Sequence, residues 1–185
     1  MTRTLYIDVD GVICPFGPEG ASGWGTGWKN STAGLLPVAY AQELVDALNR
    51  IAATPGVRCV WLTSWEELAP QYLCPAIGLD GARWPYLTAD GAGTGAGWWK
   101  LAAIQDDVEE TGPEAVAWID DQLAFEAEAQ SWARLLAAGS WPCPRTRGAE
   151  SRLPNCSGCS HFWCGRCFDL MPGTRTIDKV SRRLG

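Results

Sequence analysis

Apolar runs without alternation recur along the first three quarters of the chain, and polar, Gly- and Pro-containing segments separate them. Residues 4–9, 57–63 and 115–119 form three such runs. Short, continuous apolar runs are typical of strands buried on both faces of a parallel sheet. A fourth, shorter strand is expected over residues 84–88. The pattern therefore predicts a sheet of buried strands.

Segments with helical spacing of apolar positions lie between these runs. Helices are predicted over residues 38–53, 65–77, 98–110 and 123–138, with breaks at Pro55-Gly56 and Gly112-Pro113. A long Gly-rich loop is expected between the first strand and the first helix. Strands that alternate with helices form right-handed crossovers around a parallel sheet. The expected fold is α/β, a Rossmann-like three-layer sandwich with a parallel sheet.

Composition supports a folded globular protein. Hydrophobic residues make up 46% of the 185 residues and charged residues 19%, which excludes a disordered acidic chain. No apolar run approaches the ~20 residues that a membrane-spanning helix needs. The amino terminus lacks a stretch long enough for a signal-peptide core. We therefore expect a cytoplasmic protein without a membrane partner, and nothing in the sequence implies an obligate protein partner.

Charge and cysteine content divide the chain near residue 139. Residues 1–139 hold 7 basic and 18 acidic side chains, a net charge of −11, whereas residues 140–185 hold 8 and 3, a net charge of +5. Five of the 8 cysteines lie in the shorter segment. The expected organisation is an α/β domain over residues 1–139, followed by an atypical basic, Cys-rich tail over residues 140–185, for which an irregular or disordered chain is one of the alternatives.

Polar residues follow the predicted strands or begin a predicted helix. In parallel α/β sheets, functional groups gather at the carboxyl ends of the strands. The candidate site residues selected on this basis are Asp8, Asp10, Thr63, Ser64, Lys100, Asp120 and Asp121. We expect them to meet at one edge of the sheet.

These residue types suit the chemistry of phosphate esters. Asp8 and Asp10 are two positions apart, so in extended chain both carboxylates leave the same face, and Gly11 allows a sharp turn after them. Carboxylates that crowd together favour a hard divalent cation, here Mg²⁺. Lys100 and Thr63 add positive charge and a hydroxyl group for a phosphate. An ionised Asp at the phosphorus can act as a nucleophile.

Four segments resemble the motifs of the haloacid dehalogenase superfamily, in order and in spacing. DVDGV (residues 8–12) resembles the first motif, LTS (62–64) the second, Lys100 the third and WIDD (118–121) the fourth. The start of DVDGV and the TSW at residues 63–65 are most similar to the small, nearly capless phosphatase domains of RNA repair proteins. The resemblance spans residues 4 to about 138.

The resemblance implies a role for each matching residue. It implies that Asp8 is the nucleophile and that Asp10 is the general acid and base. It implies that Mg²⁺ is held by the Asp8 carboxylate, the Asp10 carbonyl and Asp120, with Asp121 binding directly or through water. Thr63, with Ser64 beside it, and Lys100 are implied to bind the phosphoryl group. The loop over residues 14–32 stands where related enzymes carry a flap or cap; its tryptophans, Trp24 and Trp28, are either partly buried or form an aromatic shelf for the substrate.

The tail admits two interpretations. In the first, two CxxC pairs form a small zinc knuckle in basic surroundings, with the ligands Cys156, Cys159, Cys164 and Cys167. In the second, the tail is an irregular extension, or a frameshifted version of the strand and helix that usually follow in such folds. Without that strand, residues 115–119 form an exposed edge of the sheet.

The sequence thus predicts a hydrolase, a Mg²⁺-dependent phosphatase that acts through an aspartyl phosphate on a phosphorylated small molecule or a nucleic-acid end. The alternative is an inactive protein of the same fold that binds nucleic acid or a protein through its Cys-rich tail.

Overall fold

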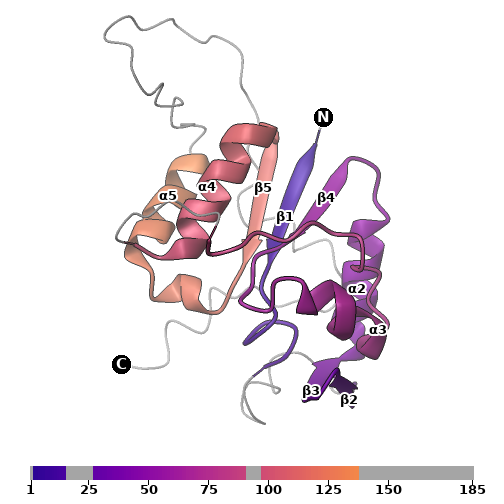
Figure 1. Cartoon of the computed structure of the whole chain (residues 1–185). Coiled ribbons are helices and arrows are strands. Elements are labelled where there is room, and N and C mark those ends of the chain that lie inside the picture. Colours follow the sequence, from indigo (N-terminus) through magenta and orange to yellow (C-terminus); the bar gives the residue numbers. More distant parts are fainter. Residues whose placement is uncertain (1, 16–26, 91–96, 138–185) are drawn as a thin grey trace, which may run out of the picture.

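The central sheet has three parallel strands with β1 in the middle. A computed structural model of the chain describes residues 2–15, 27–90 and 97–137. β1 (Arg3–Ile7) pairs with β4 (Val57–Trp61) on one side and with β5 (Ala115–Ile119) on the other. Ile7 is in register with both Trp61 and Ile119, so all three strands end at the same edge (Figure 1). The predicted parallel α/β fold is confirmed.

Helices cover both faces of this sheet. Figure 1 shows helices on both sides of the sheet. They are α2 (Gln42–Ala52) and α3 (Cys74–Ile77) on one face, and α4 (Trp99–Thr111) and α5 (Ala127–Ala137) on the other. Neighbouring residues of β1 point to opposite faces of the sheet. Ile7 packs in the core with Val45 and Leu48 of α2, and Tyr6 packs with Ile104 of α4. The sheet therefore has a separate apolar core on each face.

A β-hairpin occupies much of the segment expected to be a loop. β2 (Trp28–Ala33) pairs with β3 (Leu36–Ala41) in antiparallel register. Gly34, with φ of 63°, is the first residue of the two-residue turn, where a positive φ suits a hairpin. The prediction of a helix from residue 38 was wrong in its first turn, because residues 38–41 complete β3 and the helix begins at Gln42. Only residues 28–32 of the hairpin fall in the segment over residues 14–32 where the resemblance placed a flap; residues 16–26, with Trp24, lie outside the described residues.

The predicted helix over residues 65–77 is shorter and irregular. Residues 64–67 form turns, a π-helical turn follows over Ala69–Leu73, and α3 adds four residues. The Cys74 N–H donates to the Ala69 carbonyl, five residues back. Pro75 has no N–H with which to continue a regular ladder, and Gly78, with φ of 75°, ends α3.

Two other predicted boundaries also change. Residues 84–88 contribute only an isolated bridge between Trp61 and Tyr86 instead of a strand, because Pro85 lacks a donor for the ladder. The helix predicted from residue 123 begins instead at Ala127, after a 3₁₀ turn over Gln122–Ala124. The Asp120 carboxylate accepts a hydrogen bond from the Gln122 N–H at 2.9 Å and so holds the chain in this turn.

Among the described residues, no helix is long and apolar enough to span a membrane. In the part of the chain that the structure describes, β5 pairs only with β1, and its side chains are partly exposed. The expectation that β5 is an exposed edge depends on residues outside that part and stays a prediction. The tail over residues 140–185, with both interpretations of its cysteines, lies outside the described residues.

Candidate active site

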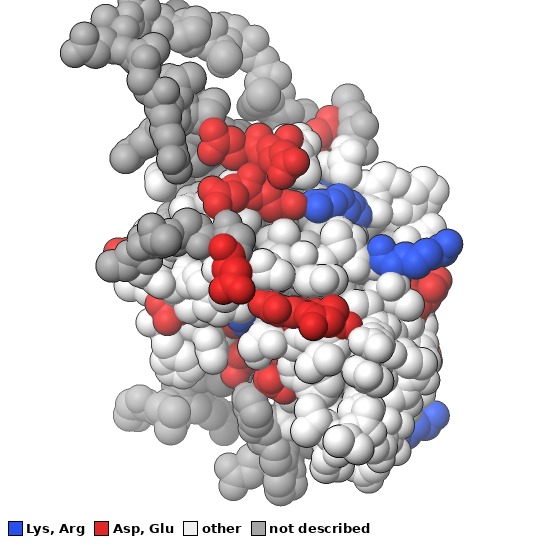
Figure 2. Space-filling model, viewed as in Figure 1, with Lys and Arg blue, Asp and Glu red and all other residues white. Residues whose placement is uncertain are grey.

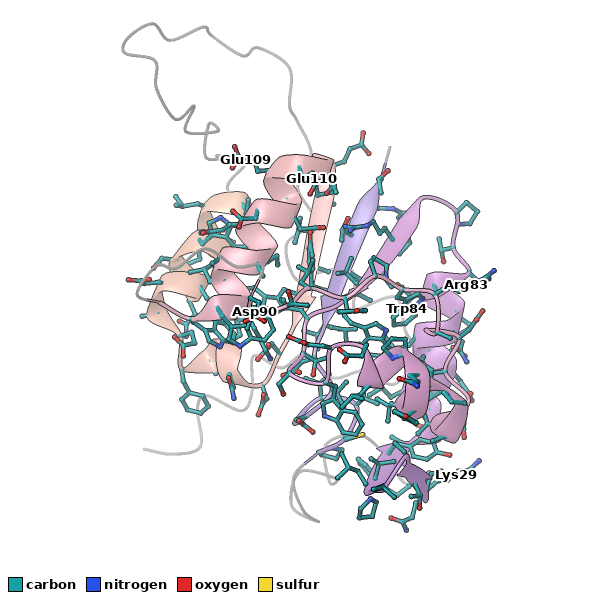
Figure 3. All side chains as sticks on the ribbon, in the orientation of Figure 1. Lys29, Arg83, Trp84, Asp90, Glu109 and Glu110 are labelled. Atoms are coloured by element: carbon teal, nitrogen blue, oxygen red, sulfur yellow. The ribbon has the colours of Figure 1, made fainter. Side chains whose placement is uncertain are left out.

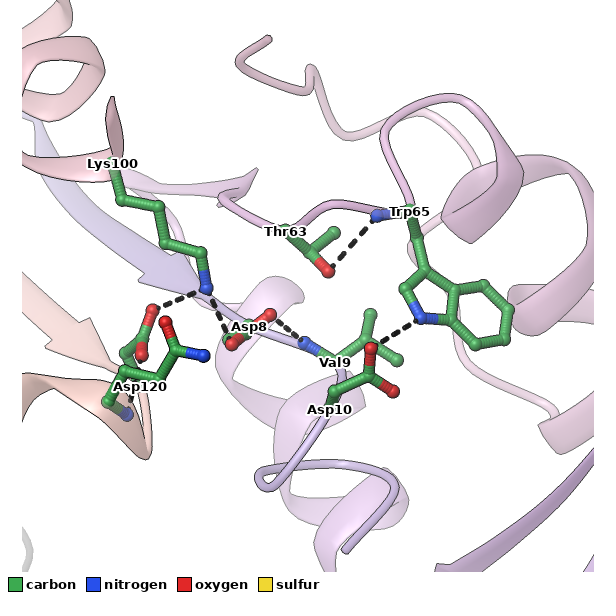
Figure 4. Close-up of polar contacts among 8 residues, drawn as sticks. Asp8, Val9, Asp10, Thr63, Trp65, Lys100 and Asp120 are labelled. Carbon is green, nitrogen blue, oxygen red and sulfur yellow. Dashed lines mark hydrogen bonds and ion pairs between the residues drawn. The ribbon is translucent and has the colours of Figure 1, made fainter. Parts of the chain in front are cut away.

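The register of the sheet places two of the predicted acids on the same side. Tyr6 and Trp118 are paired in the sheet and both face α4. Since side chains alternate along a strand, the residues two positions further on, Asp8 and Asp120, leave on that side as well. Lys100 lies in the first turn of α4 and extends toward both of them. The three side chains therefore meet at the carboxyl edge of the sheet (Figure 4).

Lys100 bridges the two carboxylates. Its Nζ donates to Asp8 Oδ2 at 2.6 Å and to Asp120 Oδ2 at 2.8 Å. Lys100 and Asp8 are buried, with 5% and 4% of their surface exposed. The Lys100 Nζ also lies 5.7 Å from the ring centroid of Trp98, within the range of a cation–π contact. Lys100 is therefore a buried lysine whose ammonium group is paired with two carboxylates.

The Asp8 carboxylate has a fixed orientation. Oδ2 accepts from Lys100, while Oδ1 accepts from the Val9 N–H at 2.7 Å. Both oxygens are thus positioned by groups on different elements, one from α4 and one from the turn after β1. A nucleophile benefits from such an arrangement, because less rotational freedom is lost when it meets a substrate.

Three carboxylates lie close enough to share a cation. Oxygens of Asp8, Asp120 and Asp121 lie within 4.8 Å of one another. Asp121 is exposed and lies against Gly11, where a Cβ atom would come within 2.3 Å of the Asp121 Cγ. Gly11, with φ of 74°, therefore leaves the space that Asp121 occupies. Three acids around one ammonium leave excess negative charge, and this donor set fits a hard divalent cation such as Mg²⁺.

Burial, reinforced by the charge of Asp8, raises the pKa values of two carboxyl groups at the site. Burial raises the pKa of Asp120; the hydrogen bond and charge of Lys100 oppose this, and the charge of Asp8 adds to it. Burial also raises the pKa of Asp10, with the hydrogen bond from Trp65 opposing the shift and the charge of Asp8 reinforcing it. An added cation would lower both pKa values and keep the acids ionised.

Asp10 and Thr63 each accept a hydrogen bond from Trp65. Asp10 Oδ2 accepts a hydrogen bond from the Trp65 Nε1–H at 3.0 Å, and Thr63 Oγ1 accepts one from the Trp65 main-chain N–H at 3.4 Å. Thr63 is fully buried, whereas Ser64 beside it is exposed. Figure 4 shows Lys100 and Asp120 on one side of Asp8, and Thr63, Trp65 and Asp10 on the other.

The structure thus gathers the predicted residues from four segments of the chain around Asp8. The Asp10 carboxylate accepts a hydrogen bond from Trp65 and lies outside the cluster of three carboxylates. This arrangement is compatible with the expectation that the main-chain carbonyl of Asp10, and not its side chain, binds the metal. The role of Asp10 and the roles of the other site residues stay predictions. Cys156, Cys159, Cys164 and Cys167 lie outside the described residues. Sequence reasoning missed the contact of Trp65 with Asp10; its only signal was the position of Trp65 directly after Thr63 and Ser64.

Comparison with known proteins yields one family. No curated protein and no solved structure matches the chain. Residues 4–139 match the family described as the HAD domain in Swiss Army Knife RNA repair proteins, and the match includes every residue of the site described above. The haloacid dehalogenase (HAD) superfamily consists mostly of hydrolases. Family match, fold and site geometry agree, and the chain belongs to the family of HAD domains of Swiss Army Knife RNA repair proteins.

Proposed function

We propose that the chain is a Mg²⁺-dependent phosphomonoester hydrolase that acts through an aspartyl phosphate on Asp8. The observation that carries this proposal is the bridge of Lys100 between Asp8 and Asp120, beside a third carboxylate. A nucleophilic anion can approach an anionic phosphate only where positive charge offsets the repulsion. Asp8 holds its nucleophilic oxygen next to such a charge.

The Mg²⁺ ion would be held by Asp8, Asp120 and Asp121 together with the Asp10 carbonyl. When bound, it would supply positive charge to the phosphoryl oxygens and orient them. Lys100 and Thr63, with Ser64 beside it, would bind the same phosphoryl group from the protein side, one as a cation and the others as hydroxyl donors. These assignments extend the family's roles to the matching residues of this chain.

The reaction has two steps at Asp8. In the first, an Asp8 carboxylate oxygen attacks the phosphorus, the ester P–O bond breaks, and Asp10 gives a proton to the leaving oxygen. In the second, Asp10 takes a proton from water, the water oxygen attacks the phosphorus, and the bond to Asp8 breaks. The products are an alcohol and inorganic phosphate, and both aspartates return to their starting states.

The substrate is a phosphorylated small molecule or a nucleic-acid end. The family's description as a domain of RNA repair proteins supports a phosphorylated nucleic-acid end. The surface argues against contact along a phosphate backbone. On the face in Figure 2, acidic side chains form several patches, whereas few Lys and Arg side chains are visible, mostly toward the right and one of them beside an acidic patch. In Figure 3, the acidic residues Glu109 and Glu110 lie at the end of α4, whereas the basic residue Arg83 lies on the α2 side of the sheet. Recognition of a terminal phosphate fits this surface better than recognition of a long strand.

The decisive test compares wild type with Asp8→Asn and with Asp106→Asn, an exposed acid on α4, as the matched control. Wild type and the control are expected to release phosphate from 4-nitrophenyl phosphate with Mg²⁺ and to stop after chelation. Asp8→Asn is expected to lose at least about a thousandfold in kcat with an unchanged fold. Acid-quenched wild type should carry phosphate on Asp8. Equal turnover by Asp8→Asn would refute the proposal.

A screen of 3′-phosphorylated oligonucleotides, nucleotides and sugar phosphates then ranks the substrate classes by kcat/KM. If no substrate is turned over and the protein instead binds zinc stoichiometrically, the alternative of an inactive fold with a metal-binding tail is favoured.

A further inference from the structure

Trp65 contacts two residues of the site through two different N–H groups. Its indole Nε1–H donates to Asp10 Oδ2 at 3.0 Å, and its main-chain N–H donates to Thr63 Oγ1 at 3.4 Å. Asp10 follows β1 and Thr63 follows β4, so residue 65 connects the two loops that carry them (Figure 4). Neither the predicted phosphate contacts nor the predicted metal ligands use this side chain.

The hydrogen bond to Asp10 restricts a carboxylate that the reaction needs in one orientation. Asp10 is half-buried and lies in the turn that Gly11 makes possible. A bond to one of its two oxygens prevents free rotation of the carboxylate about its Cβ–Cγ bond. The proton that Asp10 transfers must lie within hydrogen-bond reach of the leaving oxygen. Loss of the indole donor would leave Asp10 in place but free to rotate.

The backbone around Trp65 is itself fixed. Glu66 has φ of 45°, a left-handed conformation that is uncommon for a residue other than glycine. Its main-chain N–H donates to the Thr63 carbonyl at 3.2 Å, and its carboxylate accepts from the Ala89 N–H at 3.3 Å. The Trp65 side chain is half-buried and packs against the core beside α2 and α3. A ring held in this way can act as a rigid donor.

We propose that Trp65 is a positioning residue that holds Asp10 in the orientation required for proton transfer to the leaving group. This proposal rests on the proposed phosphatase activity. It assigns Trp65 no contact with the substrate, and it implies that the contribution of Trp65 depends on how much the leaving oxygen needs a proton. Alkyl phosphates have basic leaving groups and depend strongly on that proton, whereas 4-nitrophenolate leaves readily without it.

The test measures Trp65→Phe with 4-nitrophenyl phosphate, phenyl phosphate and an alkyl phosphate at one pH. Phe keeps an aromatic ring but has no N–H. We compare kcat/KM, because it reports the steps up to departure of the leaving group, whereas kcat can also include hydrolysis of the aspartyl phosphate, in which Asp10 acts on every substrate alike. We expect kcat/KM to fall by roughly tenfold to a hundredfold with the alkyl phosphate, by less with phenyl phosphate and least with 4-nitrophenyl phosphate, because general acid catalysis contributes about 10²–10⁴-fold in all. A role in packing alone would lower stability without any such dependence on the leaving group.

Trp84→Phe is the matched control. Trp84 is also a partly buried indole; its ring contacts that of Trp61 in a tilted arrangement, with ring centroids 5.0 Å apart, and it belongs to the same core cluster as Trp65. Figure 3 shows it near Arg83 on the α2 and α3 side of the sheet. Its replacement is expected to affect all three substrates equally. Melting temperatures of both variants measure the loss of packing.

Three outcomes are distinguishable. A graded loss in Trp65→Phe supports the proposal. A uniform loss across the leaving groups, or no loss, overturns it while wild-type turnover leaves the phosphatase assignment intact. An inactive wild type overturns both. If Trp65→Phe does not fold, Trp65→Met, which fills irregular space but also lacks the donor, decides between these outcomes.

Discussion

The Lys100 ammonium lies 2.6 Å from the Asp8 carboxylate, although 92 residues separate them in the sequence. Both groups are buried, and a second carboxylate, that of Asp120, shares the same ammonium. Removal of one partner from a buried ion pair leaves the other charge uncompensated, which is more costly than the net contribution of the pair. Lys100 is therefore expected to stabilise the site as well as to bind phosphate.

The first prediction concerns Lys100→Met. In the presence of a chelator, this variant is expected to lose about 3–5 kcal/mol of stability, because Asp8 and Asp120 then face each other without a cation. Mg²⁺ is expected to restore part of that loss, so it should raise the melting temperature of the variant more than that of wild type. Urea unfolding with and without Mg²⁺ measures both effects, and kcat/KM should fall in parallel.

Lys29→Met is the control for that experiment. Lys29 is an exposed residue of β2 whose Nζ donates to Gln42 at 2.9 Å, and it lies far from the site in Figure 3. Its replacement is expected to change stability by less than about 1 kcal/mol, with no added response to Mg²⁺. An equal response to Mg²⁺ in both lysine variants would contradict the role given to Lys100.

A second prediction concerns the close approach of Gly11 to Asp121. In Gly11→Ala, the new Cβ would meet the Asp121 Cγ and Oδ2 at 2.3 Å, so the carboxylate has to move. We expect weaker Mg²⁺ binding, measured as a higher Mg²⁺ concentration for half-maximal activity. The positive φ of Gly11 adds backbone strain of about 1–2 kcal/mol.

Gly78→Ala separates these two effects. Gly78 has φ of 75°, close to the 74° of Gly11, but a Cβ there would meet nothing within 4 Å. It should lose similar stability from backbone strain and keep its Mg²⁺ dependence. If both glycine variants shift the Mg²⁺ dependence alike, Asp121 does not act at the metal site.

A third prediction concerns the buried network of Tyr6, Arg58 and Asp107, which joins β1, β4 and α4 outside the active site. Arg58 donates to both Asp107 oxygens, at 2.7 and 2.8 Å, and the Tyr6 hydroxyl donates to Asp107 as well. Burial by itself would raise the pKa of Asp107, but the hydrogen bonds from Arg58 and Tyr6 outweigh it and lower the pKa. Burial, reinforced by Asp107, raises the pKa of Tyr6.

The two shifts give the network a pH window. The Asp107 pKa is lower in the folded state, so its contribution to stability is present above the unfolded value near 4 and is lost as the pH falls further. The Tyr6 pKa is higher in the folded state, so its contribution is present below about 10 and is lost as the pH rises above that value. Tyr6→Phe is expected to lose about 1–3 kcal/mol at pH 7.

Urea unfolding of wild type and Tyr6→Phe from pH 3 to 11 measures this dependence. The difference between them should be constant near neutral pH and shrink above pH 10, because the variant has no phenol at this position to ionise. Tyr86→Phe, at a partly exposed tyrosine in contact with β4, is the control. A difference that grows with alkaline pH would reverse the assigned sign.

Much of the architecture could be predicted from local patterns. The continuous apolar runs became β1, β4 and β5, and α4 repeats its buried apolar positions at helical spacing. Asp8 and Asp120 could be assigned to one edge because both follow parallel strands. Each of these inferences uses only the periodicity of a short segment and the geometry of parallel sheets.

The hairpin and the π-helical turn could not be predicted in the same way. β2 contains polar residues, β3 contains a proline, and a glycine lies in the turn between them. Their pairing is supported by contacts with distant segments, such as the hydrogen bond from the Ser31 hydroxyl to the Ala76 carbonyl at 2.7 Å. Pro85 is a local feature that disfavours a strand over residues 84–88. The single bridge between Tyr86 and Trp61, in contrast, depends on the position of β4 in the sheet. Such pairings involve long-range packing, which residue patterns do not encode.

Local sequence patterns were enough to predict the class of fold, the succession of its main strands along the chain and the residue types that could bind a phosphate. Three contacts became known only from the packing of the whole domain: Lys100 lies between Asp8 and Asp120, Gly11 leaves room for Asp121, and Trp65 donates to Asp10. The physical reason is the separation along the chain over which each kind of interaction acts. Periodicity and turn chemistry act over a few residues, whereas these contacts join side chains whose distances are set by the packing of α4 and the β4 loop around β1.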